Sequence, residues 1–185
     1  MVADETLRNA VLPTIRQMKP AELERIGEID RSERITQQYF AVDGRLTLID
    51  VDIDASPWVG PREAPVQRYI DQWRPLLDRG VMLGAFDGDH LAGFAIYTPP
   101  ATRYFAQFSV LHVSRSYRRT GIGRLLTDEV LALARGDGAT RLYVSATPTR
   151  GTVDFYMSCG FEPLAAPDAE LFALEPDDIH LDMRL

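Results

Sequence analysis

The sequence predicts a single mixed α/β domain built around one central sheet. Two apolar runs within residues 81–100 flank Asp87-Gly88-Asp89, which is the pattern of a β-hairpin. After that hairpin the chain alternates strand, helix, strand, helix and strand, an order typical of helices packed on one sheet. The 185 residues suit one domain with a sizeable core.

The first 80 residues predict two strand regions and two helices. Pro20 suits the first turn of a helix, where its missing N–H costs nothing, and Leu23, Ile26 and Ile29 give that helix an apolar stripe. Pro75 weakens the last turn of the second helix. In order we expect a strand at residues 12–19, a helix from residue 20 onward, and two strands around Asp43-Gly44 within residues 37–54. A loop at residues 57–65 and a helix at residues 64–80 follow.

The C-terminal half predicts alternating strands and helices, with the helices ending at glycines. Gly136 and Gly138 end the longer helix, and Gly160 ends the shorter one. The tail, residues 170–185, is acidic and then apolar, and we expect a loop leading to a closing strand that borders the pocket. The expected elements are strand 104–113, helix 121–135, strand 141–147, helix 150–160 and closing strands 161–166 and 179–185.

Composition excludes several function classes. The formal net charge of −7 argues against general nucleic-acid binding, which favours basic faces. No apolar stretch approaches the roughly 20 residues of a membrane helix, and no basic and then apolar leader begins the chain, so we expect a cytoplasmic protein with no membrane partner. Cys159 is the only cysteine, which excludes an internal disulfide and a cysteine-cluster metal site. A homodimer stays open.

The stretch from Val113 to Leu126 gathers positive charge in this acidic chain. Here a strand and a loop give way to a helix, whose first N–H groups have no internal partners. Glycines allow a ligand to approach that backbone, so the junction is suited to a phosphate. The alternative is a loop that needs glycines for turning and carries solvated arginines. The four arginines are Arg115, Arg118, Arg119 and Arg124.

Two familiar phosphate motifs do not fit this stretch. A dinucleotide-binding fingerprint needs a third glycine where Leu126 stands. A P-loop needs a Gly-Lys-Ser/Thr sequence, and Lys19 is the only lysine of the chain.

A third pattern fits. Arg118-x-x-Gly121-x-Gly123 resembles the Gln/Arg-x-x-Gly-x-Gly/Ala signature of the GCN5-related N-acetyltransferase (GNAT) superfamily. Further along, VDFYMSCGF at residues 153–161 resembles the second signature of that superfamily, and the resemblance extends over residues 81–161. It implies a GNAT-like α/β (α+β) fold with a mixed, mostly antiparallel sheet, helices on its sides and splayed strands at the cofactor site.

The resemblance also implies a domain organisation. Residues 1–185 form one N-acetyltransferase domain. Within it, residues 1–80 are the variable, acceptor-side half, 81–165 the acetyl-CoA-binding core and 166–185 the closing strand.

By the same resemblance, acetyl-CoA is the co-substrate and no metal is needed. The pyrophosphate is held at the glycine turn, and the pantetheine arm pairs with free backbone of the preceding strand, as a peptide adds to a sheet edge. The thioester then lies between the strand ends near Val113 and Ser145. The implied cofactor-binding residues are Leu111, His112, Val113, Arg118, Arg119, Thr120, Gly121, Ile122, Gly123, Arg124 and Thr149.

Two positions carry the implied chemistry near the coenzyme sulfur. Tyr156 matches the superfamily tyrosine and is the candidate general acid for the leaving thiolate; the alternative is a core aromatic beside Phe155. Thr149 stands where many members carry asparagine, and its hydroxyl has a shorter reach. A backbone N–H near Val113 is the candidate oxyanion donor.

The general base is missing from its usual places. Superfamily members often carry glutamate or histidine where this chain has Gln107 and Ser109. His112 has the opposite strand parity to Ser109, so we expect a packed histidine that faces away from it. A water relay, a carboxylate from the N-terminal half, or an acceptor amine of low pKa remain as alternatives.

The acceptor is expected to be the primary amine of a small molecule, such as an amino acid derivative, a polyamine or an aminoglycoside-like compound. Asp50, Asp52 and Asp54 alternate on a predicted strand near Tyr39 and Trp58, and could attract a cation; the alternative is a solvated strand edge. Two other functions stay open: an acetyl-CoA-binding regulatory module with little turnover, and a protein or peptide N-acetyltransferase.

Overall fold

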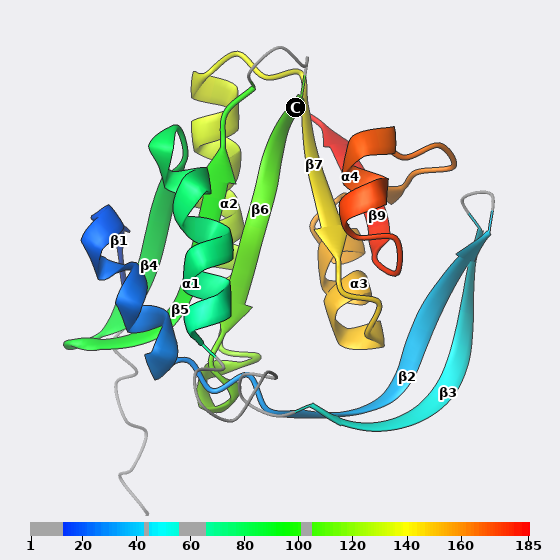
Figure 1. Cartoon of the computed structure of the whole chain (residues 1–185), viewed down its shortest axis with the longest axis horizontal. Helices are drawn as coiled ribbons and strands as arrows, with labels where there is room; N and C mark the ends of the chain where they lie inside the picture. The colour runs from blue at the N-terminus through cyan, green and yellow to red at the C-terminus, as the bar shows by residue number, and fades with distance from the viewer. Residues whose placement is uncertain (1–12, 43–44, 56–65, 101–104) are drawn as a thin grey trace, which may run out of the picture.

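A computed structural model describes residues 13–42, 45–55, 66–100 and 105–185 of the chain. Its main sheet has seven strands in the order β1-β4-β5-β6-β7-β9-β8 (Figure 1). All neighbouring pairs are antiparallel except β6 and β7, which are parallel. The strands of this sheet are β1 Thr14–Met18, β4 Val81–Asp87, β5 His90–Thr98, β6 Phe105–Val113, β7 Arg141–Ala146, β8 Glu162–Pro163 and β9 Ile179–Arg184. The mixed, mostly antiparallel sheet expected from the sequence is confirmed.

Helices cover both faces of this sheet (Figure 1). Buried side chains of α2 and α3 pack on one face, and those of η1 and α1 pack on the other. The helices are η1 Pro20–Glu28, α1 Gln67–Trp73, η2 Arg74–Asp78, η3 Arg115–Tyr117, α2 Ile122–Gly136, α3 Arg150–Ser158 and α4 Ala169–Leu174. No helix among the described residues is long and apolar enough to cross a membrane.

The first helix is a 3₁₀ helix, a form that the sequence analysis did not specify. Leu23, Ile26 and Ile29 are all buried, and they recur every third residue. That spacing matches the three residues per turn of a 3₁₀ helix, so all three side chains reach the same core.

The second helix changes form at Pro75. α1 ends at Trp73, and the 3₁₀ helix η2 begins at Arg74 with proline in its first turn. Proline has no N–H to continue the α-helical pattern, which explains why the predicted helix 64–80 is one α-helical and one 3₁₀ segment.

Strands β2 Glu33–Val42 and β3 Arg45–Ala55 form a separate antiparallel pair that curves away from the main sheet (Figure 1). The two predicted strands are therefore confirmed, whereas their Asp43-Gly44 turn and the loop at 57–65 lie outside the described residues. The pair contacts the rest of the fold where Tyr39 N donates to Pro148 O at 2.8 Å.

The tail contains one helix that we had expected to be a loop. Asp168 Oδ1 accepts hydrogen bonds from the N–H groups of Glu170 and Leu171, which makes it the N-cap of α4. The closing strand β9 follows as expected and pairs with both β7 and β8.

Candidate active site

The parallel strands β6 and β7 separate after three residue pairs. They pair at Phe105–Gln107 with Arg141–Tyr143, and beyond Gln107 no pairing continues between them. A β-bulge in β6 lies at the same place, because Ile96 pairs with Val110 while Tyr97 pairs with Phe108. The bulge bends β6, so the splayed strands implied by the family resemblance are present (Figure 1).

Six consecutive backbone amides lie at the start of α2. None of the N–H groups of residues 119–124 has a hydrogen-bond acceptor among the described residues, and the first helical bond is from Leu125 N to Gly121 O. Free N–H groups at a helix N-terminus favour a bound anion. The predicted phosphate site therefore has the expected geometry.

Both glycines of the motif have structural reasons. Gly121 has φ of 95°, a left-handed conformation that other residues adopt at a cost. A Cβ on Gly123 would lie 3.3 Å from the ring of Phe155, which is a tight contact. Glycine at these positions keeps the amides open.

The arginines of the motif differ in their roles. Arg118 is held in place, because its Nε donates to Val113 O at 3.3 Å and its Nη1 contacts Glu33 at 3.0 Å. Arg124 donates to Ser158 O at 2.9 Å. The exposed Arg119 guanidinium has no partner among the described residues. Arg119 is thus the most available charge beside the amides, whereas Arg118 braces the end of β6.

The backbone of β6 alternates between its neighbour and the gap. Ser114 N donates to Ala92 O at 2.9 Å, so the N–H of His112 also points toward β5. Leu111 and Val113 then direct their backbone groups into the gap. Of the three residues that we expected to pair with the pantetheine arm, the geometry suits these two.

Tyr156 lies next to the point where β6 and β7 separate. Its ring contacts Phe108 edge-on, with centroids 5.7 Å apart, and also contacts Phe161. The Tyr156 hydroxyl has no hydrogen bond to a described residue, and the side chain is buried, with 5% of its surface exposed. Burial raises the pKa of Tyr156, and the phenol stays protonated and able to donate.

A cavity of about 330 Å³ lies beside the point where β6 and β7 separate, on the face of the sheet covered by α1. It contains two leucines of the tail, one carboxylate, and the side chains at both positions where a general base was sought. Its lining residues are Gln72, Trp73, Leu76, Gln107, Phe108, Ser109, Tyr143, Ser145, Leu171, Leu174 and Glu175. Leu171, Leu174 and Glu175 of the tail therefore border this cavity.

His112 is a packed histidine, as predicted, but the parity argument for it was wrong. The bulge at Ser109 shifts the alternation of β6, so that Ser109 and His112 both lie on the face of Trp73. The His112 ring lies 5.6 Å from the Trp73 ring. Burial, followed by the charges of Arg31 and Arg118, lowers the pKa of His112 to about 3.

One cluster beside the cavity was missed. Tyr143 and Ser145, which line the cavity, both contact Nδ1 of the buried His180, at 2.7 and 3.3 Å. The three residues belong to β7 and β9, which are far apart in the sequence and adjacent in the sheet. The only signal in the sequence was the alternation of side chains along β7 and β9, because it places Tyr143, Ser145 and His180 on one face of the sheet.

Thr149 caps α3 and lines a cavity between β2 and the start of that helix. Its Oγ1 accepts from Thr152 N at 3.2 Å and donates to Thr152 Oγ1 at 2.9 Å. Only 4% of the Thr149 surface is exposed. The hydroxyl expected near the pantetheine arm is thus already used.

The acidic run lies on the β2–β3 pair. Asp50 accepts from Gln37 at 3.0 Å, and Asp52 pairs with Arg34 at 2.9 Å, both across the hairpin. This geometry fits the solvated strand edge. Neither described cavity is lined by Asp50, Asp52, Asp54 or Tyr39, and Trp58 lies outside the described residues.

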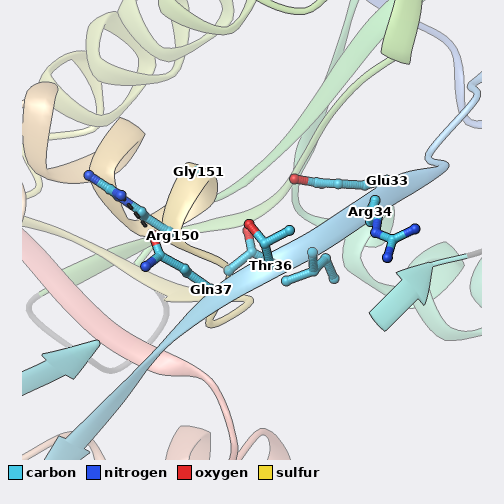
Figure 2. Close-up of a pocket in the computed structure, with 8 residues that line it drawn as sticks. Glu33, Arg34, Thr36, Gln37, Arg150 and Gly151 are labelled. Atoms are coloured by element: carbon cyan, nitrogen blue, oxygen red, sulfur yellow. Dashed lines mark hydrogen bonds between the residues drawn. The ribbon is translucent and has the colours of Figure 1, made fainter. Parts of the chain in front are cut away.

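A second cavity, of about 230 Å³, lies between β2 and the start of α3 (Figure 2). Arg150 and Gln37 point toward one another there, and Arg150 Nη1 donates to Gln37 Oε1 at 2.7 Å. Glu33 lines the same cavity and holds Arg118, which also contacts the end of β6. The cavity therefore lies at the wide end of the gap. The described residues contain no cluster of three or more metal-binding side chains.

Comparisons with known proteins agree with this geometry. The model of the acetyltransferase (GNAT) family matches residues 49–161, more than half of the chain. A comparison with curated proteins finds no significant match.

Several solved structures share the fold. A nourseothricin acetyltransferase is similar with 20% identity and a TM-score of 0.69, over 92% of this chain and 97% of that one. A protein assigned as a streptothricin acetyltransferase of Bacillus anthracis, in complex with acetyl coenzyme A, has 18% identity and a TM-score of 0.67, over 93% and 98%. The PaiA N-acetyltransferase of Thermoplasma acidophilum, in complex with coenzyme A, has 17% identity and a TM-score of 0.61, over 93% and 98%. The chain thus belongs to the acetyltransferase (GNAT) family.

Proposed function

We propose that the protein transfers an acetyl group from acetyl-CoA to the primary amine of a small molecule, by direct attack of the amine on the thioester. One observation carries this proposal: the gap between β6 and β7 has a row of backbone amides without acceptors on one face of the sheet and a cavity on the other. Two substrates can therefore meet in the gap from opposite faces.

The residues around the gap fit acetyl-CoA. The amides of residues 119–124 are positioned for the pyrophosphate, with Arg119 as the nearest unpaired charge. The gap-facing backbone of Leu111 and Val113 can pair with the amides of the pantetheine arm, as a strand pairs with an edge. The N–H of Val113 is the donor available for the oxyanion.

Tyr156 is the proposed proton donor to the departing sulfur. Its ring contacts Phe108, next to the point where β6 and β7 separate, and its raised pKa keeps the proton on the phenol at neutral pH. A protonated donor is what a leaving thiolate needs.

The cavity on the other face fits a small cationic amine. Its volume of about 330 Å³ is at the small end of ligand pockets. Among the described residues that line it, Glu175 is the only charged one, and Trp73 supplies an aromatic wall. The proteins named for nourseothricin and streptothricin support a small-molecule acceptor by analogy. We therefore place the acceptor side in residues 66–80 and in the tail 166–185.

A regulatory module that binds acetyl-CoA without turnover is the second candidate. It is favoured by the non-basic side chains of Gln107 and Ser109, and by the use of the Thr149 hydroxyl as a helix cap. The two functions differ in whether bound acetyl-CoA is consumed.

A thiol-release assay separates these candidates. Wild-type protein is incubated with acetyl-CoA and, in separate reactions, nourseothricin, spermidine, kanamycin, lysine or a lysine-containing peptide. We expect release that depends on a small amine. Binding of acetyl-CoA without release over this panel would favour the regulatory module, and release with the peptide alone would indicate a protein acetyltransferase.

A further inference from the structure

His180 lies at the centre of a hydrogen-bonded cluster behind the acceptor cavity. Its Nε2 is 3.0 Å from Glu175 O, and its Nδ1 is 2.7 Å from the Tyr143 hydroxyl and 3.3 Å from Ser145 Oγ. The ring is only 4% exposed and lies 5.5 Å from the ring of Phe172. The imidazole is thus fixed on both nitrogens.

These contacts determine the tautomer. A carbonyl oxygen can only accept, so Nε2 carries the hydrogen that bonds to Glu175 O. Nδ1 of the neutral ring is then an acceptor, and the Tyr143 hydroxyl donates to it. The lone pair of His180 is thereby directed toward the side chains that line the cavity.

The cluster lies next to the positions where the base is missing. Tyr143 and Ser145 line the same cavity as Gln107 and Ser109, neither of which can take a proton. Gln107 and Tyr143 are partners in the last residue pair before the strands separate. A proton released where the strands separate can therefore reach the Tyr143 hydroxyl on β7, although β6 offers no base there.

We propose that His180 is the terminal proton acceptor of the transfer reaction, reached from the acceptor amine through the hydroxyl of Tyr143, with Ser145 beside it. This inference rests on the proposed function. As nitrogen bonds to the thioester carbon, its surplus proton moves to the Tyr143 oxygen, and the Tyr143 proton moves to Nδ1 of His180. The electron pair of the breaking C–S bond stays on sulfur, which takes the Tyr156 proton.

The step is balanced. An amine and a thioester become an amide and a thiol, and the protein is left with an imidazolium at His180 and a phenolate at Tyr156. One proton exchanged through water restores both groups. No oxidant, reductant or metal is required.

The surroundings of His180 suit this role. Burial is the main cause that lowers its pKa below the ordinary 6.5, so the ring is neutral and able to accept at neutral pH. The charge of Glu175 favours the imidazolium once it forms. The titratable and charged groups around the cluster are Tyr143 and Arg141 of β7, Asp168 and Glu175 at the two ends of α4, Asp178 and Asp182 on the segment of His180, and Glu162 of β8 opposite Asp182. Arg141 forms an ion pair with Asp182.

The test uses His180→Asn, which keeps an acceptor oxygen near the Nδ1 position but cannot take up a proton. We expect kcat for the best amine of the panel to fall about 10²-fold, with acetyl-CoA affinity unchanged. In the wild-type protein, kcat/KM should fall as pH decreases through the lowered pKa of His180, and this fall should be absent from the pH profile of His180→Asn. Tyr143→Phe should cause a similar loss, and the double variant should lose no more than either one.

His90→Gln is the matched control, because His90 lies on the exposed β4–β5 hairpin, 3.6 Å from Glu28. It should keep both kcat and the acid limb. A wild-type kcat in His180→Asn and in Tyr143→Phe would overturn the inference while leaving acetyl transfer in place. Absence of transfer by the wild-type protein to every amine would overturn both the inference and the proposed function. If His180→Asn shows no folding transition, Tyr143→Phe alone decides, since it removes a single oxygen.

Discussion

At the scale of single residues, Tyr156 has the most direct effect on the proposed chemistry. Tyr156→Phe should lower kcat about 10²-fold, because the leaving thiolate loses its proton donor. Acetyl-CoA affinity should remain within about twofold, since the ring packing on Phe108 is kept. Steady-state kinetics with calorimetric binding measure both quantities.

Tyr117→Phe is the matched control for this change. It also removes one hydroxyl, which donates to Asp87 on the surface at 2.9 Å. Equal losses in both variants would show that the effect at Tyr156 is not specific to the sulfur site.

If the proposed acceptor cavity binds a cationic amine, Glu175 should set its charge preference. Glu175→Gln should raise KM for a cationic amine about fivefold, the effect of roughly 1 kcal/mol for one partly exposed ion pair. The His180 contact is to the backbone oxygen of Glu175 and is kept. Kinetics at low salt, with Glu129→Gln on the exposed side of α2 for comparison, would reveal the change; an unaltered KM would place the acceptor elsewhere.

The residues that the sequence identified belong to local motifs. Gly121, Gly123 and Tyr156 could be proposed from the sequence because each lies within a short pattern whose chemistry depends on neighbours in the chain. His180 and Tyr143 were not found, because their contact exists only through the pairing of β7 with β9. Likewise, the side of the sheet on which His112 lies depends on a bulge that strand alternation does not reveal.

At the scale of elements, α2 connects the fold to the anion site. Its two ends carry glycines with opposite requirements. Gly121 has a positive φ, whereas Gly136 does not, and neither has a neighbour within 4 Å of an added Cβ. Gly121→Ala should therefore lower the free energy of unfolding by about 1 kcal/mol. Gly136→Ala should raise it by about 0.5 kcal/mol. Urea denaturation measures both, and a stabilising Gly121→Ala would contradict the left-handed start of α2.

Element type was predictable where a local pattern determines it. The hairpin β4–β5 and helix α2 follow from apolar periodicity and from glycine ends. The α-helix that ends before Pro75 and the 3₁₀ form of η1 depend on details of backbone hydrogen bonding. α4 was missed, although Asp168 is a recognisable N-cap, because six residues give little periodicity.

At the scale of the whole molecule, the fold brings the amides of residues 119–124 and the cavity beside α1 to one gap from opposite faces. The acidic tail contributes Glu175 to the cavity. The carboxylates that are close together in this tail disfavour one another's charged forms. Burial, with the nearby Glu175 and Asp177, raises the pKa of Asp178 to about 7. Because the folded state holds this proton more tightly, the stabilisation is fully present at low pH and is lost as pH rises through about 7.

Asp178→Asn removes this titration. We expect the melting temperature of the variant to exceed that of the wild type by more at pH 8 than at pH 5. Scanning calorimetry at both values is the measurement, and a difference that does not change with pH would contradict the raised pKa of the partly buried Asp178.

The central claim is that acetyl-CoA binds in the gap between β6 and β7. The most direct test is a titration of ¹⁵N-labelled protein with acetyl-CoA, followed through the backbone amide resonances. The account predicts saturable shifts at residues 119–124 and at Leu111 and Val113, and smaller changes on the β2–β3 pair. An absence of binding, or shifts confined to other parts of the molecule, would contradict it.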